Sequence, residues 1–290
     1  MILVTGASGA LGRLVTEHLA EAPGLTVTAG TRDPGAWNGP QVEVRAVDFD
    51  DPATLPGAFD GVTTLVFITA GFAEDDVVYA RHKAVVDAAA AAGVRNIVYT
   101  SLTGGADRLS IAVAHRYTER VLAEAPVEAT VLRNGLYAEL VAGMLAAPAL
   151  ATGRLPGPIR DGRVPAVVRA DLAEAAANVA ADIERGSTVH NGRVYELEGP
   201  EDLGLDDITA LLAEAGRPGV EDGRSLAELR EASAPAPGYQ VGHTVSIFAV
   251  VAGGLITRGD SDLPELLGRE PTPVREHVGQ VLAHLASAAG

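Results

Sequence analysis

The sequence predicts an α/β protein with a doubly wound parallel sheet, and three observations carry that prediction. Short apolar runs alternate with helical segments through the first half of the 290 residues, an order typical of parallel strands joined by crossover helices. The runs are almost wholly apolar, which indicates strands buried on both faces. After residue 135 the alternation ends. We therefore expect a smaller, mainly helical C-terminal part.

The expected elements follow in order along the chain. Strands are expected at residues 2–5, 25–31, 42–47, 63–69, 96–101 and 128–132, with helices between them at 11–20, 75–92 and 116–124. Later helices are expected at 138–150, 171–183, 206–214, 226–232 and 273–285, and Pro-rich loops at 148–165 and 233–238. We divide the chain into a larger domain of residues 1–155, to which a strand near 193–198 returns, and a smaller domain of residues 156–290.

Composition excludes several classes of protein. The formal net charge is −16 and Lys83 is the only lysine, so a nucleic-acid surface built from clustered basic side chains is not expected. The absence of cysteine rules out disulfides and fits a reducing compartment. No apolar run is long enough to cross a membrane, and no leader pattern precedes the first strand. We expect a cytoplasmic protein with no membrane contact.

Three glycines connect the first strand to the first helix. Gly6, Gly9 and Gly12 are spaced G-x-x-G-x-x-G. Glycine allows a tight turn, a close approach of the backbone to a pyrophosphate and close packing of helix on strand, and the helix N-terminus attracts phosphate. A glycine pattern alone is unspecific, but strand, turn and helix together predict the dinucleotide site of a Rossmann sheet. The residues expected to contact the dinucleotide here are Gly6, Ser8, Gly9, Ala10, Leu11 and Gly12.

The end of the second strand bears on which dinucleotide is bound. Arg32 comes first and Asp33 second. In the Rossmann layout an arginine here accommodates a 2′-phosphate, whereas an acid binds the 2′-hydroxyl. We therefore expect NADP(H), with Asp33 keeping NAD(H) as the less favoured alternative. An ordinary solvated turn at Arg32 stays open.

Further cofactor contacts are expected at later places along the same edge, where ligands of open parallel sheets bind. A carboxylate and a ring after the third strand can flank an adenine, although they also fit an ordinary helix start. Small residues after the fourth strand let a ribose lie against the backbone. A histidine on the next helix can approach the cofactor, and an amide ends the sixth strand. These residues are Asp48, Phe49, Thr69, Ala70, Gly71, His82 and Asn134.

Several stretches together resemble a known family. They are TGASGALG at the N-terminus, TRDP after the second strand, NIVYTS on the fifth strand, the pair His115 and Glu119, LRNGLY at residues 132–137, and the tail SDLPELLGREPTPVREHV. The chain resembles the atypical short-chain dehydrogenases/reductases, and within them the NmrA-like, quinone oxidoreductase 2-like family. The resemblance implies an NADP(H)-binding Rossmann domain with a smaller part closing over a substrate cleft. It also implies either a reductase of quinone-like or conjugated acceptors or a redox sensor.

The catalytic residues depart from the standard short-chain pattern. Ser101 occupies the place of the usual serine, but no Tyr-x-x-x-Lys follows it, because Tyr117 is followed four residues later by Val121. The one literal Tyr-x-x-x-Lys, at residues 79–83, lies on the helix before the fifth strand. Our candidates for chemistry are therefore Ser101; His115, whose pKa should lie near working pH; and Tyr137, beyond the sixth strand. Core packing is the competing interpretation for Tyr137.

These observations predict an NADPH-dependent oxidoreductase that transfers hydride to a quinone-like or conjugated carbonyl acceptor. Such an acceptor spreads the negative charge that it gains, so a missing proton donor matters less. Two alternatives stay open: an NADP(H)-binding redox-sensing regulator acting through a protein partner, and a secondary-pathway reductase, dehydratase or isomerase of the same fold. Neither a metal site nor a hydrolase nucleophile is predicted. The expected partner is a small-molecule acceptor, and a homodimer stays open.

Overall fold

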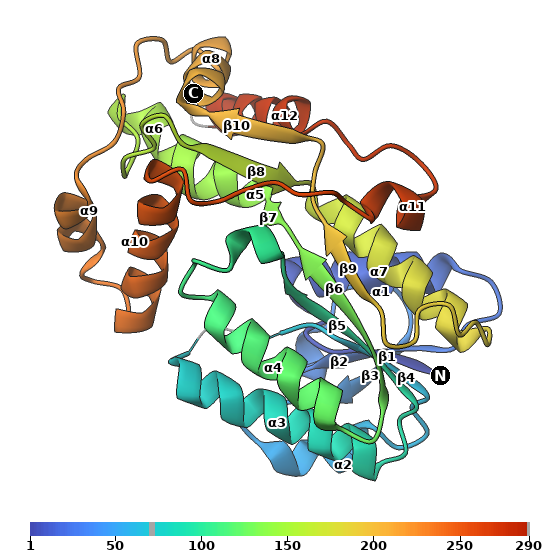
Figure 1. Cartoon of the computed structure of the whole chain (residues 1–290). Helices are drawn as coiled ribbons and strands as arrows, with labels where there is room; N and C mark the ends of the chain where they lie inside the picture. Colours follow the sequence, from blue (N-terminus) through green and yellow to red (C-terminus); the bar gives the residue numbers. More distant parts are fainter. Residues whose placement is uncertain (70–72, 289–290) are drawn as a thin grey trace.

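A parallel sheet forms the centre of the larger part of the molecule (Figure 1). The computed structural model describes residues 1–69 and 73–288, and within them seven strands pair in the order β3-β2-β1-β4-β5-β6-β9. All of the neighbouring pairs are parallel. The strands are β1 (Ile2–Val4), β2 (Val27–Thr31), β3 (Glu43–Ala46), β4 (Thr64–Phe67), β5 (Asn96–Leu102), β6 (Glu128–Asn134) and β9 (Val194–Leu197). This order confirms the predicted doubly wound Rossmann sheet.

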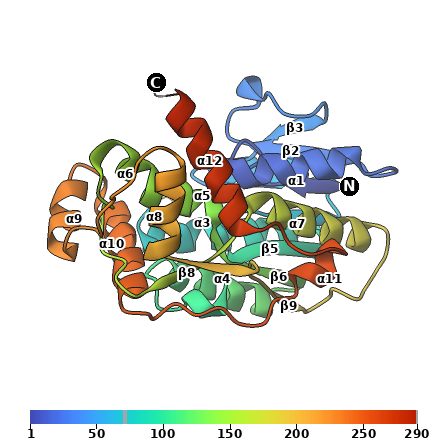
Figure 2. The ribbon, with the colours of Figure 1, turned by 90° about the horizontal axis from the view of Figure 1, so that it is seen from above.

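Helices cover both faces of this sheet (Figures 1 and 2). The helices are α1 (Ala10–Glu21) and α7 (Arg169–Glu184) on one face, and α2 (Leu55–Ala58), α3 (Asp75–Ala91) and α4 (Ala112–Glu124) on the other. Successive side chains of a strand point to opposite faces. Ile2 and Val4 accordingly pack with α1 and α7, whereas Leu3 packs with α2 and α3. The apolar strands are therefore buried on both sides, as the sequence predicted. Single 3-10 turns lie at Pro34–Ala36, Pro52–Thr54 and Gly104–Ala106.

The C-terminal part contains a second, smaller sheet as well as helices. Its strands are β7 (Leu136–Tyr137), β8 (Arg163–Val167) and β10 (Glu201–Gly204), in the order β10-β8-β7. Its helices are α5 (Ala138–Leu140), a π-helical segment (Val141–Ala146), α6 (Ala147–Thr152), α8 (Leu205–Glu214), α9 (Leu226–Ser233), α10 (Gly238–Ala252) and α12 (Val274–Ala288). Apolar side chains of this sheet and these helices form one buried cluster.

Three features of this part were not predicted. The small sheet was missed because β7 has two residues and β8 contains Pro165, which is unusual inside a strand. The expected loop at 148–165 is helical up to Thr152 and becomes strand from Arg163. Helix α10 was missed because its glycines and β-branched residues have low helix propensity. Its buried side chains, Phe248 and Val251 among them, stabilise it by packing.

Several elements that follow residue 155 return to the large sheet. Helix α7 packs beside α1, β9 pairs with β6, and α11 (Leu263–Leu267) packs on α7. The C-terminal half of the chain thus contributes to the large sheet in more places than the one strand near 193–198. The division into domains at residues 1–155 and 156–290 stays a prediction. Within residues 1–69 and 73–288, no helix has the length and hydropathy needed to cross a membrane.

Candidate functional site

The glycine turn between β1 and α1 packs too closely for any side chain at its last position. Gly6 has φ of +59°, in the left-handed region that favours glycine. A Cβ placed on Gly12 would lie 2.3 Å from the carbonyl oxygen of Gly6, and one on Gly9 would lie 3.2 Å from the same oxygen. The Ala7 amide donates to the carbonyl of Gly30 at 3.1 Å. Helix α1 therefore begins directly against the turn, with its N-terminus at the carboxyl edge of the sheet.

The N-terminus of α1 is open at this edge. Ser8, Gly9 and Ala10 are exposed, whereas Leu11 is buried among apolar side chains. The N-cap Gly9 provides no side-chain acceptor, and the first N–H groups of a helix have no acceptor within the helix. These donors and the positive end of the helix dipole favour an anion here. The geometry fits a dinucleotide pyrophosphate.

The two charged residues after β2 differ in how they are used. The Asp33 carboxylate accepts a hydrogen bond from the Gly35 amide at 3.0 Å and caps the following 3-10 turn. The Arg32 side chain is exposed and makes no hydrogen bond or ion pair with any residue in 1–69 or 73–288. A guanidinium without a partner at this position can receive a 2′-phosphate. A carboxylate engaged in a cap is less free to bind a ribose hydroxyl.

The other predicted cofactor residues are distributed along the sheet edge. Asp48 is half-buried and accepts from the Asp50 amide at 3.0 Å. The Phe49 ring is buried and packs edge-on against Phe67, with ring centroids 5.8 Å apart, so its ring belongs to the core beneath the edge. Thr69 is half-buried just beyond β4. The predicted contacts at Ala70 and Gly71 lie outside the described residues.

Two histidines lie in the layer between β5, α3 and α4. His82 is 1% exposed, and its Nδ1 lies 2.7 Å from Thr118 Oγ1. Burial, followed by His115 and Arg81, lowers the pKa of His82 to about 3. The His115 Nδ1 lies 3.0 Å from the Tyr99 hydroxyl, and burial, followed by Arg116, lowers the pKa of His115 to about 4. Both imidazoles are neutral at pH 7.

These placements correct one expectation and qualify another. The prediction that the pKa of His115 lies near working pH is wrong for this environment, because burial disfavours the imidazolium. A neutral His115 is not a general acid at pH 7. His82 was expected to approach the cofactor from its helix. Its ring instead packs edge-on against Phe67, with the centroids 5.1 Å apart.

Ser101 belongs to an ion-pair network. Ser101, Arg133 and Glu196 are in register on the neighbouring strands β5, β6 and β9. The Ser101 hydroxyl donates to Glu119 on α4 at 2.5 Å, and Glu119 also receives bonds from Arg116 at 2.5 Å and Arg133 at 2.7 Å. Arg133 donates to Glu196 at 2.9 Å. Burial raises the pKa of Glu119, but the bonds from Arg133 and Ser101 outweigh burial and hold it below its usual value.

Tyr137 and Asn134 lie at the far end of the same edge. The guanidinium carbon of Arg169 lies 5.0 Å from the centroid of the Tyr137 ring. Asn134 is 3% exposed at the end of β6. Sequence reasoning missed Arg169, and it also missed that Arg116 and Arg133 bond to Glu119 and that Arg133 bonds to Glu196. The sequence does show a charged residue, Arg133, near the end of an apolar strand. It does not show the partner, because Glu119 lies on another element, α4.

Both members of the literal Tyr-x-x-x-Lys pair have other partners. Lys83 is exposed and forms an ion pair with Asp87 at 2.6 Å. The Tyr79 ring stacks on Tyr117, with centroids 4.3 Å apart. The lysine is therefore engaged at the surface of α3.

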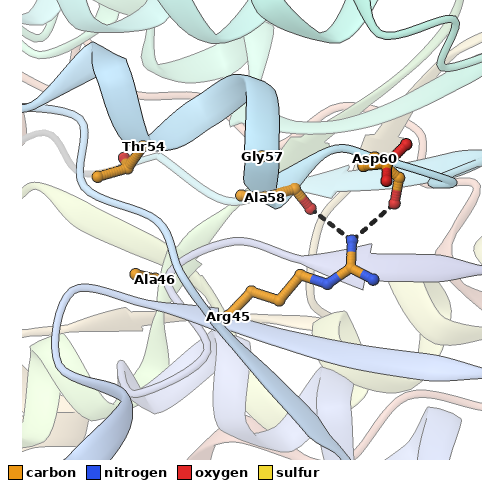
Figure 3. A pocket seen from close by; sticks show the side chains of 6 residues that line it. All are labelled: Arg45, Ala46, Thr54, Gly57, Ala58 and Asp60. Atoms are coloured by element: carbon orange, nitrogen blue, oxygen red, sulfur yellow. Dashed lines mark hydrogen bonds between the residues drawn. The ribbon is translucent and has the colours of Figure 1, made fainter.

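A separate hollow beside β3 and α2 contains none of the predicted residues (Figure 3). The Arg45 guanidinium lies across it and donates to the carbonyl oxygens of Ala58 and Asp60, at 2.9 and 2.7 Å. Because these bonds occupy the charged group, the hollow offers little to a ligand.

Comparison with known proteins places the chain in a family. The model of the NmrA-like family matches residues 1–208. Quinone oxidoreductase 2 of Escherichia coli is 38% identical over 218 residues, which are 73% of each chain. An NmrA-like family domain-containing oxidoreductase of Aspergillus flavus is 30% identical, covering 97% of this chain and 94% of its own.

Solved structures agree with this placement. The NADPH complex of the Escherichia coli NADPH-dependent quinone oxidoreductase has a TM-score of 0.84 at 32% identity, over 97% of this chain and 99% of that one. A Citrobacter triphenylmethane reductase complexed with NADP(H) has a TM-score of 0.82 at 29% identity, with the same coverage. The predicted resemblance is thereby confirmed. The chain belongs to the NmrA-like family.

Proposed function

We propose that this protein transfers a hydride from NADPH to a quinone-like or other conjugated carbonyl acceptor. It is an NAD(P)H-dependent oxidoreductase that acts on a small molecule, in keeping with its family and with the expectation from sequence. The class of acceptor goes beyond that statement, and it is what the experiment below tests.

The observation that carries the proposal is the open N-terminus of α1 beside Arg32, whose guanidinium has no partner in the part of the chain that the structure describes. Backbone donors at Ser8 and Ala10 suit a pyrophosphate, the Gly9 amide being engaged by the Gly6 carbonyl, and the Arg32 guanidinium suits the 2′-phosphate that distinguishes NADPH from NADH. Asp33, the residue that would favour NAD(H), is engaged in its cap. NADP(H) is therefore the cofactor, and when bound it supplies the hydride.

A conjugated acceptor follows from the residues at the other end of the edge. Ser101 is engaged by Glu119, His115 is neutral, and Lys83 pairs with Asp87 at the surface. An isolated ketone gains a localised alkoxide and needs the strongly activated donor of a Tyr-x-x-x-Lys pair, whereas a quinone or enone delocalises the charge, so that a weaker acid suffices. Positioning the acceptor in a dry cleft then supplies much of the rate. Relatives named quinone oxidoreductase, azoreductase and triphenylmethane reductase also act on conjugated compounds.

A panel of acceptors tests the proposal. NADPH oxidation is followed with benzoquinones, naphthoquinones, linear enones and a saturated ketone, each against a reaction without enzyme. We expect turnover with at least one conjugated acceptor and none with the saturated ketone. Turnover of the ketone alone would contradict the proposed acceptor class. Tight NADPH binding without turnover of any acceptor would instead favour the redox-sensing regulator.

A further inference from the structure

Three polar side chains at the end of β6 form what we call the Tyr137 cluster: Asn134, Tyr137 and Arg169. Asn134 is the last residue of β6, Tyr137 ends β7, and Arg169 is the first residue of α7. The Tyr137 ring packs against the apolar cluster that contains Leu11 and Ile68. Ile68 is also the residue that a Cβ on Gly6 would meet, at 3.7 Å. The Tyr137 cluster therefore lies at the carboxyl edge of the sheet, on the same apolar cluster as the first helix and three strands away from β1 in the sheet order.

Arg169 is a cation that the surrounding protein leaves largely unmatched. Its guanidinium lies over the Tyr137 ring, and among residues 1–69 and 73–288 it has no ion pair within 4.0 Å. Its Nε is buried and has no hydrogen-bond partner in those residues. An arginine remains protonated in proteins. Its charge is therefore directed at the face of the ring.

Asn134 provides an independent sign that this cluster meets a ligand. The residue is only 3% exposed, and its Oδ1 has no hydrogen-bond partner among the described residues. A buried acceptor without a donor costs about 1 to 3 kcal/mol. Such an atom is expected where a bound molecule supplies the missing donor.

We propose that Tyr137 donates the proton that completes reduction of the acceptor, and that Arg169 stabilises the phenolate left behind. This inference rests on the proposed function. The acceptor carbon gains a hydride from the bound dinucleotide, the π pair of the conjugated carbonyl moves to oxygen, and that oxygen takes the Tyr137 proton. Solvent then returns a proton to the phenolate. Arg169 is a positioning residue, since it acts through the ring it covers, and Asn134 orients the ligand.

The charges around Tyr137 agree with this role. Burial raises the pKa of the phenol, the amide of Asn134 and the charge of Arg169 lower it, and Glu139 raises it. Glu139 itself accepts from the Arg169 amide at 3.3 Å and lies 3.3 Å from His277 Nε2 on α12. Tyr137 therefore holds its proton at pH 7, and Arg169 and Glu139 act on its acidity in opposite directions.

Three variants and one matched control test the proposal. Tyr137→Phe removes only the hydroxyl, and we expect it to lower kcat by about a hundredfold with NADPH affinity unchanged. Arg169→Met should lower kcat by roughly tenfold and shift the alkaline limb of the kcat profile to higher pH, because the phenol loses a stabilising cation. Arg169→Lys should restore part of kcat. The matched control is Arg193→Met. The Arg193 guanidinium also lies over a tyrosine ring, 5.1 Å from the centroid of Tyr195, but at the opposite edge of the sheet. We expect this variant to leave kcat and its pH profile unchanged.

A second readout does not depend on turnover. The tyrosinate absorbance of the wild type minus that of Tyr137→Phe reports the titration of Tyr137 alone. The same difference in the Arg169→Met background should show a higher pKa. An unshifted titration, or an alkaline limb that Arg169→Met leaves in place, would overturn the inference while leaving the proposed function intact. Absence of turnover with every acceptor in the wild type would overturn both.

Discussion

The carboxyl edge of the large sheet has two halves that use their polar groups in opposite ways. Around β1 and β2, the donors at Ser8 and Ala10 are exposed, and Arg32 has no partner among residues 1–69 and 73–288. Around β5, β6 and β9, Ser101 and the neighbouring charges bond to one another through Glu119. The sequence marks residues in both halves as functional. The groups of the first, open half are free for a ligand, whereas the Ser101–Glu119 network of the second half is closed; at the end of β6, Asn134 and Arg169 keep atoms without a partner among the described residues.

Whether a polar group has a partner in the fold distinguishes ligand-binding residues from structural residues better than a sequence motif does. A donor or charge left unpaired at a ligand-binding edge is a cost that a bound molecule removes. A charge that already has three partners contributes to the fold. By this criterion we expect the glycine turn and Arg32 to bind cofactor and the Tyr137 cluster to meet a ligand, and we expect Ser101 to support the junction of its strands with α4.

We expect the largest effect from Gly12→Ala, which disturbs the glycine turn of the open half. An added Cβ would lie 2.3 Å from the Gly6 carbonyl oxygen, so Gly12→Ala must move helix or turn by about 1 Å, and displacements of that size cost on the order of 100-fold in rate. We expect NADPH-dependent turnover to fall by that factor. Gly143→Ala is the matched control, because a Cβ there meets nothing within 4 Å. Equal activity of both variants would show that the close packing is not required.

The next largest effect is a loss of stability when the network around Glu119 is broken. Glu119→Ala leaves Arg116 and Arg133 without their shared partner, and loss of one member of a partly buried network should lower the free energy of unfolding by about 2 to 4 kcal/mol. Denaturant unfolding at pH 7 measures this change. Ser101→Ala removes one neutral donor and should cost about 1 kcal/mol. A Ser101→Ala variant that is stable but inactive would show that Ser101 acts in catalysis, as the sequence had suggested.

The pH dependence of stability sharpens the same contrast. The pKa of Glu119 is held below its usual value in the folded protein, so the folded state binds fewer protons than the unfolded state near that value. The stability from Glu119 is therefore fully present above the unfolded pKa of about 4.3 and declines as pH falls below it. The wild type should lose more unfolding free energy than Glu119→Gln between pH 5 and pH 3. Parallel profiles would contradict this assignment.

Local requirements could be predicted from the sequence, and long-range pairings could not. The glycine turn was predicted because its three glycines are close neighbours along the chain. The partners of Glu119 depend on the register that places Ser101, Arg133 and Glu196 side by side on three strands. The low pKa of His115 depends on burial. Arg169 reaches Tyr137 only after the chain has built the small sheet between them.

The most direct test of the account is the dinucleotide preference of Arg32→Ala, measured by calorimetric titration with NADPH and NADH. Charge-assisted bonds to the 2′-phosphate are worth roughly 1.5 to 3 kcal/mol, which is about ten- to a hundredfold in affinity. We predict that Arg32→Ala loses affinity for NADPH by this factor and keeps its affinity for NADH, and that salt narrows the difference in the wild type. Equal losses for both dinucleotides, or a wild type that prefers NADH, would contradict the central claim that the open half of the edge binds NADPH through Arg32.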